Sequence, residues 1–293
     1  FHETIEAYFA AKARLFSPER ARFAVVNRDD EFGRRLLDRA EIPTVSYSLG
    51  DARDLELNLT EASFRLGKRA VRLHFGGEFN VSNALAAASA ARALGVEPDA
   101  IVAGLDEAKG IPGRFEAIKG AGGVLAIVDY AHTPAGLEGL LTAVRAERLA
   151  ARIPENPGVI VVFGCGGERD RGKRPVMGAV ASRLADVVVL TTDNPRSEDP
   201  ETIIEEIRAG MSGPAKLVVE PNRRTAIAGA LRAARPGDVV VVAGKGHETT
   251  QEFADVTLRF DDREVVRAEL EWIGRATRGA GRAGARRANG AAR

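Results

Sequence analysis

Cysteine is almost absent from this chain of 293 residues. Cys165 is the only one, which excludes an internal disulfide framework. No histidine partner is evident near it, so we expect Cys165 to pack rather than to act as a nucleophile. Such a composition is typical of a reducing compartment, and we expect a cytoplasmic protein. Long apolar runs are missing too, since none approaches the roughly 20 residues that cross a bilayer, and we expect no membrane partner.

The first residues lack two further signals. The stretch FHETIEAYFAAKARLF has no basic start followed by an apolar run, so we expect no signal peptide here. It also lacks an initiator methionine and opens within an expected helix, so we expect a piece of a longer chain. The phosphate-binding pattern GxxxxGK(S/T) is absent from all 293 residues.

What is present suits a soluble globular protein of about two domains, with 45% hydrophobic and 28% charged residues. The net charge of +1 conceals six arginines and no acid in residues 274–293, without which the rest would carry about −5. Glycine, alanine and arginine cannot build a core, so we expect a disordered tail there. Nucleic-acid binders usually carry their basic patch on the folded part, so we expect no nucleic-acid partner.

Strands and helices alternate from about residue 114. The expected strands cover 123–130, 158–167, 186–193, 216–220 and 238–246, and the expected helices 134–150, 173–185, 200–211 and 223–234. These strands are short, β-branched and continuously apolar, which favours a parallel sheet covered on both faces. The fold class is therefore α/β, with a doubly wound, Rossmann-like second half. Such sheets bind ligands beyond the carboxyl ends of their strands, where VDYAH, GCGGERDRGKR, TTDNPR and AGKGHE lie.

The first half is less regular. We expect a strand at 23–27, a helix at 31–40, strands within 44–77, and helices at 82–95 and 98–108. Asn80, Ser82 and Asn83 stand just ahead of the alanine-rich helix, where such residues commonly serve as caps. The segment KGIPGRFEAI interrupts the pattern with glycine and proline. We therefore place the domains at 1–112 and 113–273, with the tail at 274–293.

Two loops combine glycine with charge. FGCGGERDRGKRP places glycines directly after a strand, where backbone N–H groups can approach an anion. A tight turn is the plain alternative, but Arg169, Arg171, Lys173 and Arg174 favour an anion site. In AGKGHE, Glu248 either receives a substrate ammonium or belongs to a glycine turn with solvated charges. The residues alone leave both interpretations of Glu248 open.

Seven segments in a fixed order resemble the Mur ligases. They are EAYFAAKARLF, FNVSNALAA, GRFE, VDYAHTP, FGCGGERDRGKRPVMG, TTDNPRSEDP and GKGHE, and the resemblance runs from residue 1 to about Trp272. It is strongest to the members that add diaminopimelate to peptidoglycan precursors. It implies that ATP phosphorylates the D-glutamate carboxylate of a UDP-linked muramoyl dipeptide, and that an amino-acid amine then attacks the acyl phosphate. Mg²⁺ and cationic side chains would offset the phosphoryl charge.

The resemblance implies roles near the nucleotide for five residues. Lys12 matches a lysine that reacts with CO₂, and the carbamate would help to hold Mg²⁺. Without the resemblance, Lys12 would be interpreted as an exposed helix lysine. Asn83 matches an asparagine that contacts adenine, and Arg114 an arginine near the phosphates. Asp129 matches a carboxylate that accepts from the ribose hydroxyls, and His132 is expected beside the nucleotide.

The resemblance also implies an amino-acid pocket. In diaminopimelate-adding members, the asparagine and arginine of DNPR, here Asn194 and Arg196, bind the distal end of meso-diaminopimelate. An arginine fork can bind both oxygens of a carboxylate. Lysine-adding relatives lack this arginine, because their substrate has no second carboxylate. The remaining pocket residues that the match implies are Arg169, Asp193, Gly244 and Glu248.

This sequence departs from the family pattern in several places that bear on whether the chain alone can carry out the ligation. The uridine-binding domain, the ATP phosphate loop and further Mg²⁺ ligands have no match here, and Glu3 stands where the family usually has glycine. We therefore expect that this chain alone does not ligate. A related Mur-type or folate-glutamate ligase with another acceptor is one alternative. An NAD(P)-dependent dehydrogenase is another, although the GxGxxG spacing is missing. The sequence does not predict an oligomeric state.

Overall fold

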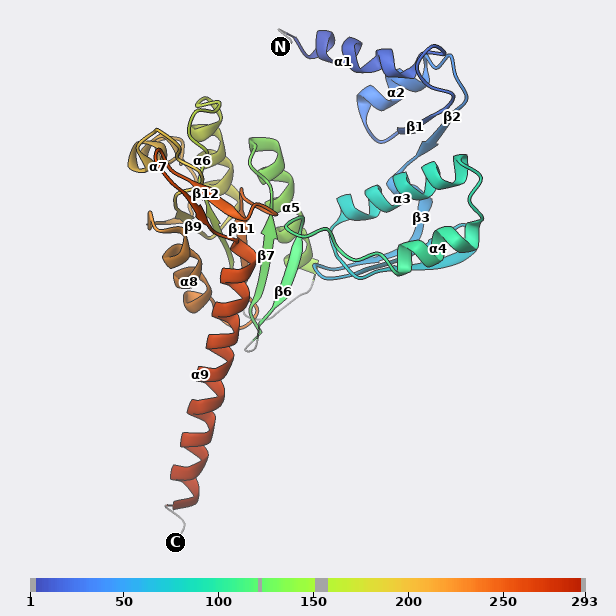
Figure 1. The fold of residues 1–293 in the computed structure, drawn as a ribbon. Coiled ribbons are helices and arrows are strands. Elements are labelled where there is room, and N and C mark those ends of the chain that lie inside the picture. Colours follow the sequence, from blue (N-terminus) through green and yellow to red (C-terminus); the bar gives the residue numbers. More distant parts are fainter. Residues whose placement is uncertain (1–3, 121–122, 151–157, 291–293) are drawn as a thin grey trace. The chain divides into compact units, whose positions relative to one another are not determined.

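The chain forms two compact units, Phe1–Lys109 and Gly110–Arg293 (Figure 1). The structure is a computed structural model that describes residues 4–120, 123–150 and 158–290. The division between the units falls three residues before the domain boundary that the sequence suggests. Each unit has its own sheets and its own buried apolar cluster.

The first unit carries a short parallel pair and an antiparallel sheet. Strands β1 and β2 pair in parallel, and β3, β4 and β5 form a meander whose inner face packs on α3. Its elements are α1 (Ile5–Ala13), η1 (Arg14–Phe16), β1 (Ala24–Asn27), α2 (Glu31–Leu37), β2 (Thr44–Tyr47), η2 (Leu49–Asp51), β3 (Ala52–Leu57), β4 (Ala62–Leu66), β5 (Arg69–Leu73), α3 (Glu78–Ala93) and α4 (Pro98–Asp106).

Helix α3 begins earlier than the sequence suggests. Its N-cap is Gly77 with φ of 94°, so Asn80 lies inside the first turn. Asn80 is buried, and its Nδ2 donates to the carbonyl of Gly76 at 2.7 Å. The expectation that Asn80, Ser82 and Asn83 cap this helix is therefore wrong. A glycine with positive φ replaces the side-chain cap, because it turns the chain before the helix.

The second unit is built around a 6-stranded sheet. Its elements are β6 (Glu116–Lys119), β7 (Leu125–Asp129), α5 (Pro134–Ala150), β8 (Val159–Phe163), α6 (Lys173–Leu184), β9 (Val187–Leu190), α7 (Pro200–Arg208), β10 (Lys216–Val219), α8 (Arg223–Ala233), β11 (Val239–Ala243), β12 (Thr250–Glu252), β13 (Thr257–Arg259) and α9 (Asp262–Gly290). The predicted alternation of strands and helices in this half is confirmed.

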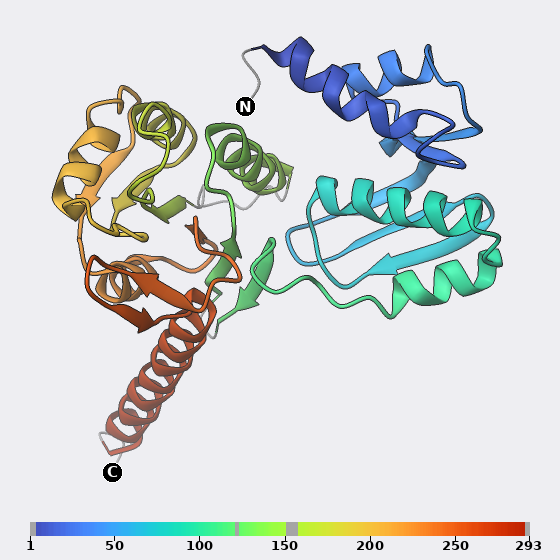
Figure 2. The ribbon, with the colours of Figure 1, turned by 45° about the horizontal axis from the view of Figure 1, so that its top comes forward.

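The sheet has the order β10-β9-β8-β11-β7-β6, and all neighbours pair in parallel except β6 with β7. Strands β8 and β11 are buried at every position, as their unbroken valine-rich sequences predict. Helices α5, α6 and α7 lie on one face, while α8 and α9 lie on the other (Figure 2). Because β11 returns between β7 and β8, the strand order reverses there, as in other doubly wound folds.

Four elements of this unit differ from expectation. The antiparallel edge strand β6 and the short β12–β13 hairpin are too brief and too polar to show a strand pattern in the sequence. Helix α9 continues to Gly290, into the segment for which disorder was expected. Alanine and arginine are strong helix formers, so a helix that begins on the folded unit can extend through them.

None of the helices in the described ranges is both long enough and apolar enough to cross a membrane.

A buried ion pair joins α8, α9 and the central strand. The first residue of α8, Arg223, binds the carboxylate of Asp262 through Nε at 2.8 Å and Nη2 at 2.7 Å. Its Nη2 also donates to the carbonyl of Ala243, the last residue of β11, at 3.0 Å. Both side chains of the pair are fully buried. Removing one partner would leave an uncompensated charge in the interior, which is far more costly than losing an exposed pair.

We expect Arg223→Ala to lower the free energy of unfolding of this unit by about 3–5 kcal/mol. The matched control is Arg183→Ala, whose partner Glu138 is half exposed, and we expect a loss of at most about 1 kcal/mol there. Urea unfolding followed by the fluorescence of Trp272, the single tryptophan, measures both. Equal losses in the two variants would contradict this account of the buried pair.

Candidate functional site

The carboxyl ends of four neighbouring strands carry the unusual loops. The sheet register pairs Ala243 at the end of β11 with Asp129 at the end of β7, and Phe163 at the end of β8 with Leu190 at the end of β9. The loops that follow therefore start side by side. The segments VDYAH, GCGGERDRGKR, TTDNPR and AGKGHE gather at one edge, as predicted.

The glycines after β8 allow two of these loops to touch. A Cβ at Gly164 would lie 2.1 Å from the carbonyl oxygen of Thr191, and one at Gly167 would lie 1.9 Å from that of Pro195. Gly167 also donates its N–H to the carbonyl of Asn194 at 2.8 Å. Only glycine fits such close approaches. In this structure the glycine cluster thus joins the β8 loop to the β9 loop, which places DNPR beside GCGG.

Asn194 lies at the centre of the site and is buried. Its Oδ1 accepts from Lys245 Nζ at 2.8 Å and from the backbone N–H of Glu252 at 3.1 Å. Its Nδ2 donates to Glu248 Oε2 at 2.9 Å. The structure thus brings together Asn194 and Glu248, two residues that the sequence places 54 positions apart. Lys245, which the sequence analysis did not assign to the site, connects them.

The Glu248 carboxylate is held in its charged form. Burial alone would raise its pKa, but hydrogen bonds from Lys245 and Asn194 and the charge of Lys245 outweigh it. The resulting pKa of Glu248 is below its ordinary value. The contacts with Lys245 and Asn194 both involve Oε2. A half-buried carboxylate with its second oxygen outside these contacts suits a cationic ligand group.

Arg196 faces the same region in a strained backbone conformation. Its φ is 53°, a left-handed value that is uncommon outside glycine and costs of the order of 1 kcal/mol or more. The side chain binds Glu252 Oε2 through Nε at 3.0 Å and the carbonyl of Gly167 through Nη1 at 2.8 Å. These contacts use two of the five N–H groups of a guanidinium. The others can bind a carboxylate.

The side chains of Arg169 and Arg196 both lie close to Gly166. A Cβ at Gly166 would lie 3.3 Å from Arg196 Nη1 and 3.7 Å from Arg169 Cγ. Arg169 is exposed, and its Nη1 donates only weakly, to the carbonyl of Glu168 at 3.2 Å. Gly244, with φ of 111°, borders the site from the β11 loop, where a Cβ would lie 2.8 Å from Asp193 Oδ2. All six predicted pocket residues thus belong to adjoining loops.

The other cations of the β8 loop do not face an open site. Arg174 is fully buried, and its Nη1 binds Glu198 at 2.9 Å and Glu206 at 2.7 Å. Arg171 also pairs with Glu206. The hydrogen bonds of Arg174 lower the pKa of Glu198 to about 2. The expected anion site formed by four cations is therefore corrected: Arg171 and Arg174 hold the loop to α7.

A second group of residues surrounds Tyr130, just after β7. The Arg114 guanidinium lies 4.5 Å from the centre of the Tyr130 ring, and the rings of His132 and His247 lie 4.5 Å and 5.0 Å from it. Lys173 Nζ donates to the backbone carbonyl of His132 at 2.8 Å. Predicted residues Arg114 and His132 thus come together around an aromatic ring that the sequence analysis did not single out.

Asp129, at the end of β7 and next to Tyr130 in the sequence, is buried. Its Oδ2 accepts the backbone N–H of Phe115 at 2.7 Å, and its Oδ1 accepts that of Ala131 at 2.7 Å. Burial raises the pKa of the Asp129 carboxyl, and these two hydrogen bonds oppose the shift without cancelling it. Asp129 therefore ties GRFE to VDYAH, in addition to any contact with a ligand.

Lys12 and Asn83 lie in the first unit. Both are exposed, and Lys12 Nζ lies 4.5 Å from the centre of the Tyr8 ring. Within the described ranges, no group of three or more His, Cys, Asp or Glu side chains could hold a metal ion. The described residues do not by themselves fit the Mg²⁺ site that the resemblance implies, so no catalytic step is assigned to that ion.

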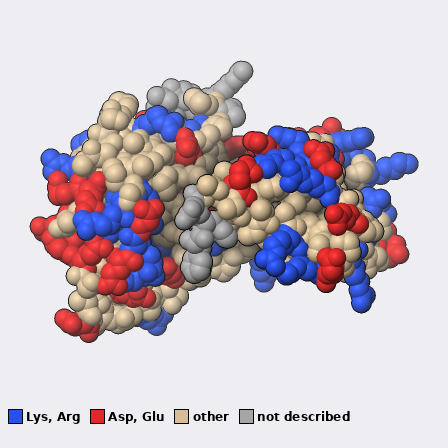
Figure 3. Space-filling view, turned by 90° about the horizontal axis from the view of Figure 1, so that it is seen from above, with Lys and Arg blue, Asp and Glu red and all other residues tan. Residues whose placement is uncertain are grey.

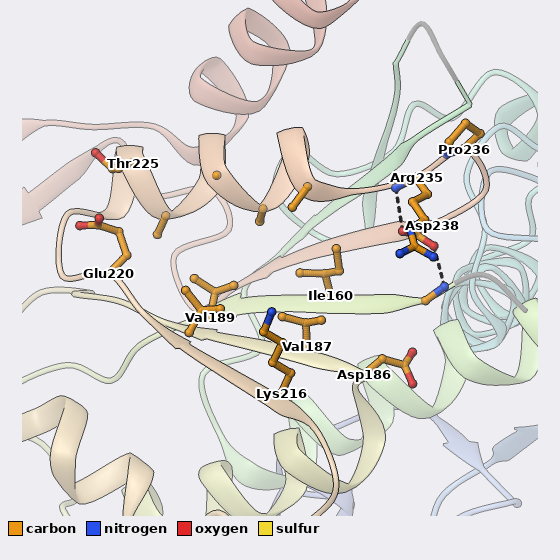
Figure 4. Close-up of a pocket in the computed structure, with 16 residues that line it drawn as sticks. Ile160, Asp186, Val187, Val189, Lys216, Glu220, Thr225, Arg235, Pro236 and Asp238 are labelled. Atoms are coloured by element: carbon orange, nitrogen blue, oxygen red, sulfur yellow. Dashed lines mark hydrogen bonds between the residues drawn. The ribbon is translucent and has the colours of Figure 1, made fainter.

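A cavity of about 870 Å³ lies elsewhere, between α8 and the sheet face of β8, β9 and β10 (Figure 4). Its walls are largely apolar, with Ile160, Val187 and Val189 below α8. The carboxylate of Asp238 at one end already accepts the backbone N–H groups of Gly158 at 2.6 Å and Arg235 at 2.7 Å. These polar groups hold the fold together, so we locate the functional site at the strand ends.

Positive and negative side chains are mixed on the face of the described residues that Figure 3 shows. On the face in Figure 3, Lys and Arg side chains are interspersed with Asp and Glu. A nucleic-acid-binding domain would gather its basic residues on one face or along one helix. The visible face of the described residues therefore gives no support to that alternative.

Comparison with known proteins identifies two domain families. The family model of the Mur ligase middle domain matches residues 1–91, and that of the Mur ligase glutamate ligase domain matches residues 113–246. The UDP-N-acetylmuramoyl-L-alanyl-D-glutamate–2,6-diaminopimelate ligase of Streptomyces avermitilis is 43% identical over 288 residues, and that of Gloeobacter violaceus is 45% identical over 280. Each match covers 92% of this chain and 56% of the relative. The chain thus spans a little over half the length of these relatives.

Solved structures give the same result. A structure of a ligase of the same name is 38% identical with a TM-score of 0.59, over 92% of this chain and 57% of that one. The UDP-N-acetylmuramate-alanine ligase MurC of Thermotoga maritima is 20% identical with a TM-score of 0.60, over 94% and 56% of the two chains. Folylpolyglutamate synthase of Mycobacterium tuberculosis is 22% identical with a TM-score of 0.61, over 83% and 58%. The last two likenesses concern the fold alone.

We expect Cys165 to be inert in the folded protein. It is buried, its Sγ lies 3.7 Å from Met177 Sδ, and burial raises the pKa of its thiol to about 12. Thiolate is the reactive form, and almost none is present at pH 8. Iodoacetamide at pH 8, followed by intact mass, should alkylate glutathione in the same tube long before the folded chain. In urea the chain should react readily. Equal rates for glutathione and folded protein would restore Cys165 as a candidate nucleophile.

Proposed function

The chain belongs to the Mur ligase family, and from this we propose that it serves an ATP-dependent, ADP-forming ligase of peptidoglycan precursor synthesis. The proposed reaction adds meso-diaminopimelate to UDP-N-acetylmuramoyl-L-alanyl-D-glutamate. ATP would phosphorylate the D-glutamate carboxylate, because a free carboxylate is a poor electrophile. The diaminopimelate amine would then attack the acyl carbon, so that a C–N bond forms and phosphate leaves. These substrates would place the reaction in the cytoplasm.

The observation that carries the proposal is the arrangement of Asn194, Arg196 and Glu248. The distal centre of diaminopimelate carries one carboxylate and one ammonium. Arg196 offers N–H groups beyond those bound to Glu252 and Gly167, and an arginine fork suits a carboxylate. Glu248 offers Oε1 to the ammonium while its Oε2 is bound to Lys245 and Asn194. Opposite charges on neighbouring loops thus match the two distal groups of this substrate.

The remaining predicted residues would serve the nucleotide. We propose that Arg114 lies near the phosphates and His132 beside the nucleotide, both close to the Tyr130 ring, and that Asp129 accepts from the ribose hydroxyls. Asn83 would contact adenine from the first unit. Lys12, as a carbamate, would contribute one oxygen to Mg²⁺ beside ligands other than the described residues. These assignments rest on the family resemblance, whereas the amino-acid pocket also rests on geometry within one unit.

Ligases with other acceptors form the second candidate. Folylpolyglutamate synthase and MurC share the fold at 20–22% identity, which says nothing of the acceptor. Arg196 and Glu248 together favour diaminopimelate, because alanine and lysine lack a second carboxylate for Arg196 and glutamate lacks a second ammonium for Glu248. A nicotinamide cofactor has no comparable support, since the glycines after β8 are occupied in packing against the β9 loop.

We expect Arg196→Ala to weaken binding of meso-diaminopimelate to this chain by at least about 30-fold. Losing one partner of a hydrogen-bonded charge pair typically costs about 2–5 kcal/mol. Calorimetry measures the dissociation constants of meso-diaminopimelate and of L-lysine, which lacks the distal carboxylate. The affinity for L-lysine should change less than about twofold. Arg183→Ala, on the surface of α6, is the matched control and should alter neither ligand.

Two results would contradict the pocket assignment. One is an Arg196→Ala variant that binds meso-diaminopimelate as tightly as the unmodified chain does. The other is an equal loss for both ligands, which would mean that Arg196 supports the loop rather than the distal carboxylate.

A further inference from the structure

We infer that Lys245 is a positioning residue that makes the pocket selective for a distal carboxylate, by fixing the amide of Asn194. The inference rests on the proposed function, because it concerns the same pocket. Lys245 is fully buried, and its Nζ contacts Asn194 Oδ1 at 2.8 Å and Glu248 Oε2 at 2.9 Å. A buried ammonium is costly unless it is paired and hydrogen-bonded. These two contacts satisfy that requirement.

The backbone around Lys245 directs its side chain inward. Gly244 and Gly246 on either side have φ of 111° and 52°, values that other residues rarely adopt. A Cβ at Gly246 would lie 2.5 Å from the carbonyl oxygen of Gly113 and 2.6 Å from Tyr130 Cβ. The turn GKG therefore admits no side chain on either side of the lysine. It presents Lys245 to the loop that carries Asn194.

Lys245 determines which way the Asn194 amide points. An ammonium can only donate hydrogen bonds, so the amide must present its oxygen to Lys245. The backbone N–H of Glu252, also a donor, reaches the same oxygen at 3.1 Å. Two donors on Oδ1 leave Nδ2 on the opposite side, where one N–H binds Glu248 at 2.9 Å. The second N–H of Nδ2 is then offered to a ligand.

This orientation matters for a carboxylate ligand. With the amide turned as it is, Asn194 adds a donor beside the guanidinium of Arg196. With the amide reversed, an oxygen would face the ligand, and two acceptors repel each other. Lys245 also engages Oε2 of Glu248, which leaves Oε1 for the substrate ammonium. Lys245 thus leaves the N–H donor of Asn194 Nδ2 for the ligand carboxylate and the acceptor Oε1 of Glu248 for the ligand ammonium.

Two variants distinguish the contribution of the Lys245 hydrogen-bond donor from that of its positive charge. Lys245→Met removes both, whereas Lys245→Gln keeps an N–H donor for Asn194 Oδ1 without the charge. Both variants leave Glu248 without its cation, but this carboxylate is partly exposed and keeps its hydrogen bond from Asn194, so both should fold. Urea unfolding followed by Trp272 fluorescence checks this. Lys216→Met, at an exposed lysine of β10, is the matched control. The readout is the ratio of the dissociation constants of L-lysine and meso-diaminopimelate, measured by calorimetry.

We expect Lys245→Met to lower this ratio by about tenfold or more, through weaker binding of meso-diaminopimelate, since tenfold corresponds to about 1.4 kcal/mol. Lys245→Gln should give a ratio between those of Lys245→Met and the unmodified chain, and Lys216→Met should leave it unchanged. A ratio in Lys245→Met within twofold of the unmodified chain would overturn the inference. So would an equal weakening of both ligands, which indicates a purely structural role. If the unmodified chain does not prefer meso-diaminopimelate to L-lysine, the proposed function fails instead.

Discussion

The buried ammonium of Lys245 joins the two loops on which the candidate site depends. It links the turn after β11 to Asn194 after β9, and Asn194 in turn holds Glu248 and the backbone of Glu252. Arg196 then pairs with Glu252. This shared contact fixes the acidic and basic sides of the pocket relative to each other, together with the contacts of Asn194 with Glu248 and of Arg196 with Glu252. The glycines of both loops make this contact possible, because they allow the loop backbones to approach each other closely.

The two kinds of predicted contact are distributed differently over the chain. The residues assigned to the amino acid all lie in the second unit, on loops that follow β8, β9 and β11. Those assigned to the nucleotide are divided, with Lys12 and Asn83 in the first unit and Arg114 and Asp129 in the second. All residues proposed to bind the amino acid therefore belong to one unit, and this part of the proposed function does not require residues of the first unit. It is also the part that the geometry supports best.

Much of the second unit could be predicted from the sequence, because continuous apolar strands such as VVVL and VVVVA report burial directly. Motif order also placed Asn194, Arg196 and Glu248 at one sheet edge. The sequence could not show which charged side chains form ion pairs within the protein and which remain available to a ligand. From its position beside Arg169 in the sequence, Arg174 was expected to bind an anion, but in the structure its guanidinium forms ion pairs with Glu198 and Glu206. Such pairings depend on contacts 24 and 32 residues away, which local patterns do not encode.

A crystal structure of this chain with meso-diaminopimelate bound would show directly how the proposed pocket holds the distal end of the ligand. We expect the distal carboxylate within hydrogen-bonding distance of the Arg196 guanidinium and Asn194 Nδ2, and the distal ammonium at Glu248 Oε1. We also expect Lys245 to stay bound to Asn194 Oδ1. A ligand whose distal end points away from Arg196, or an Asn194 amide that turns its oxygen toward the carboxylate, would contradict these expectations.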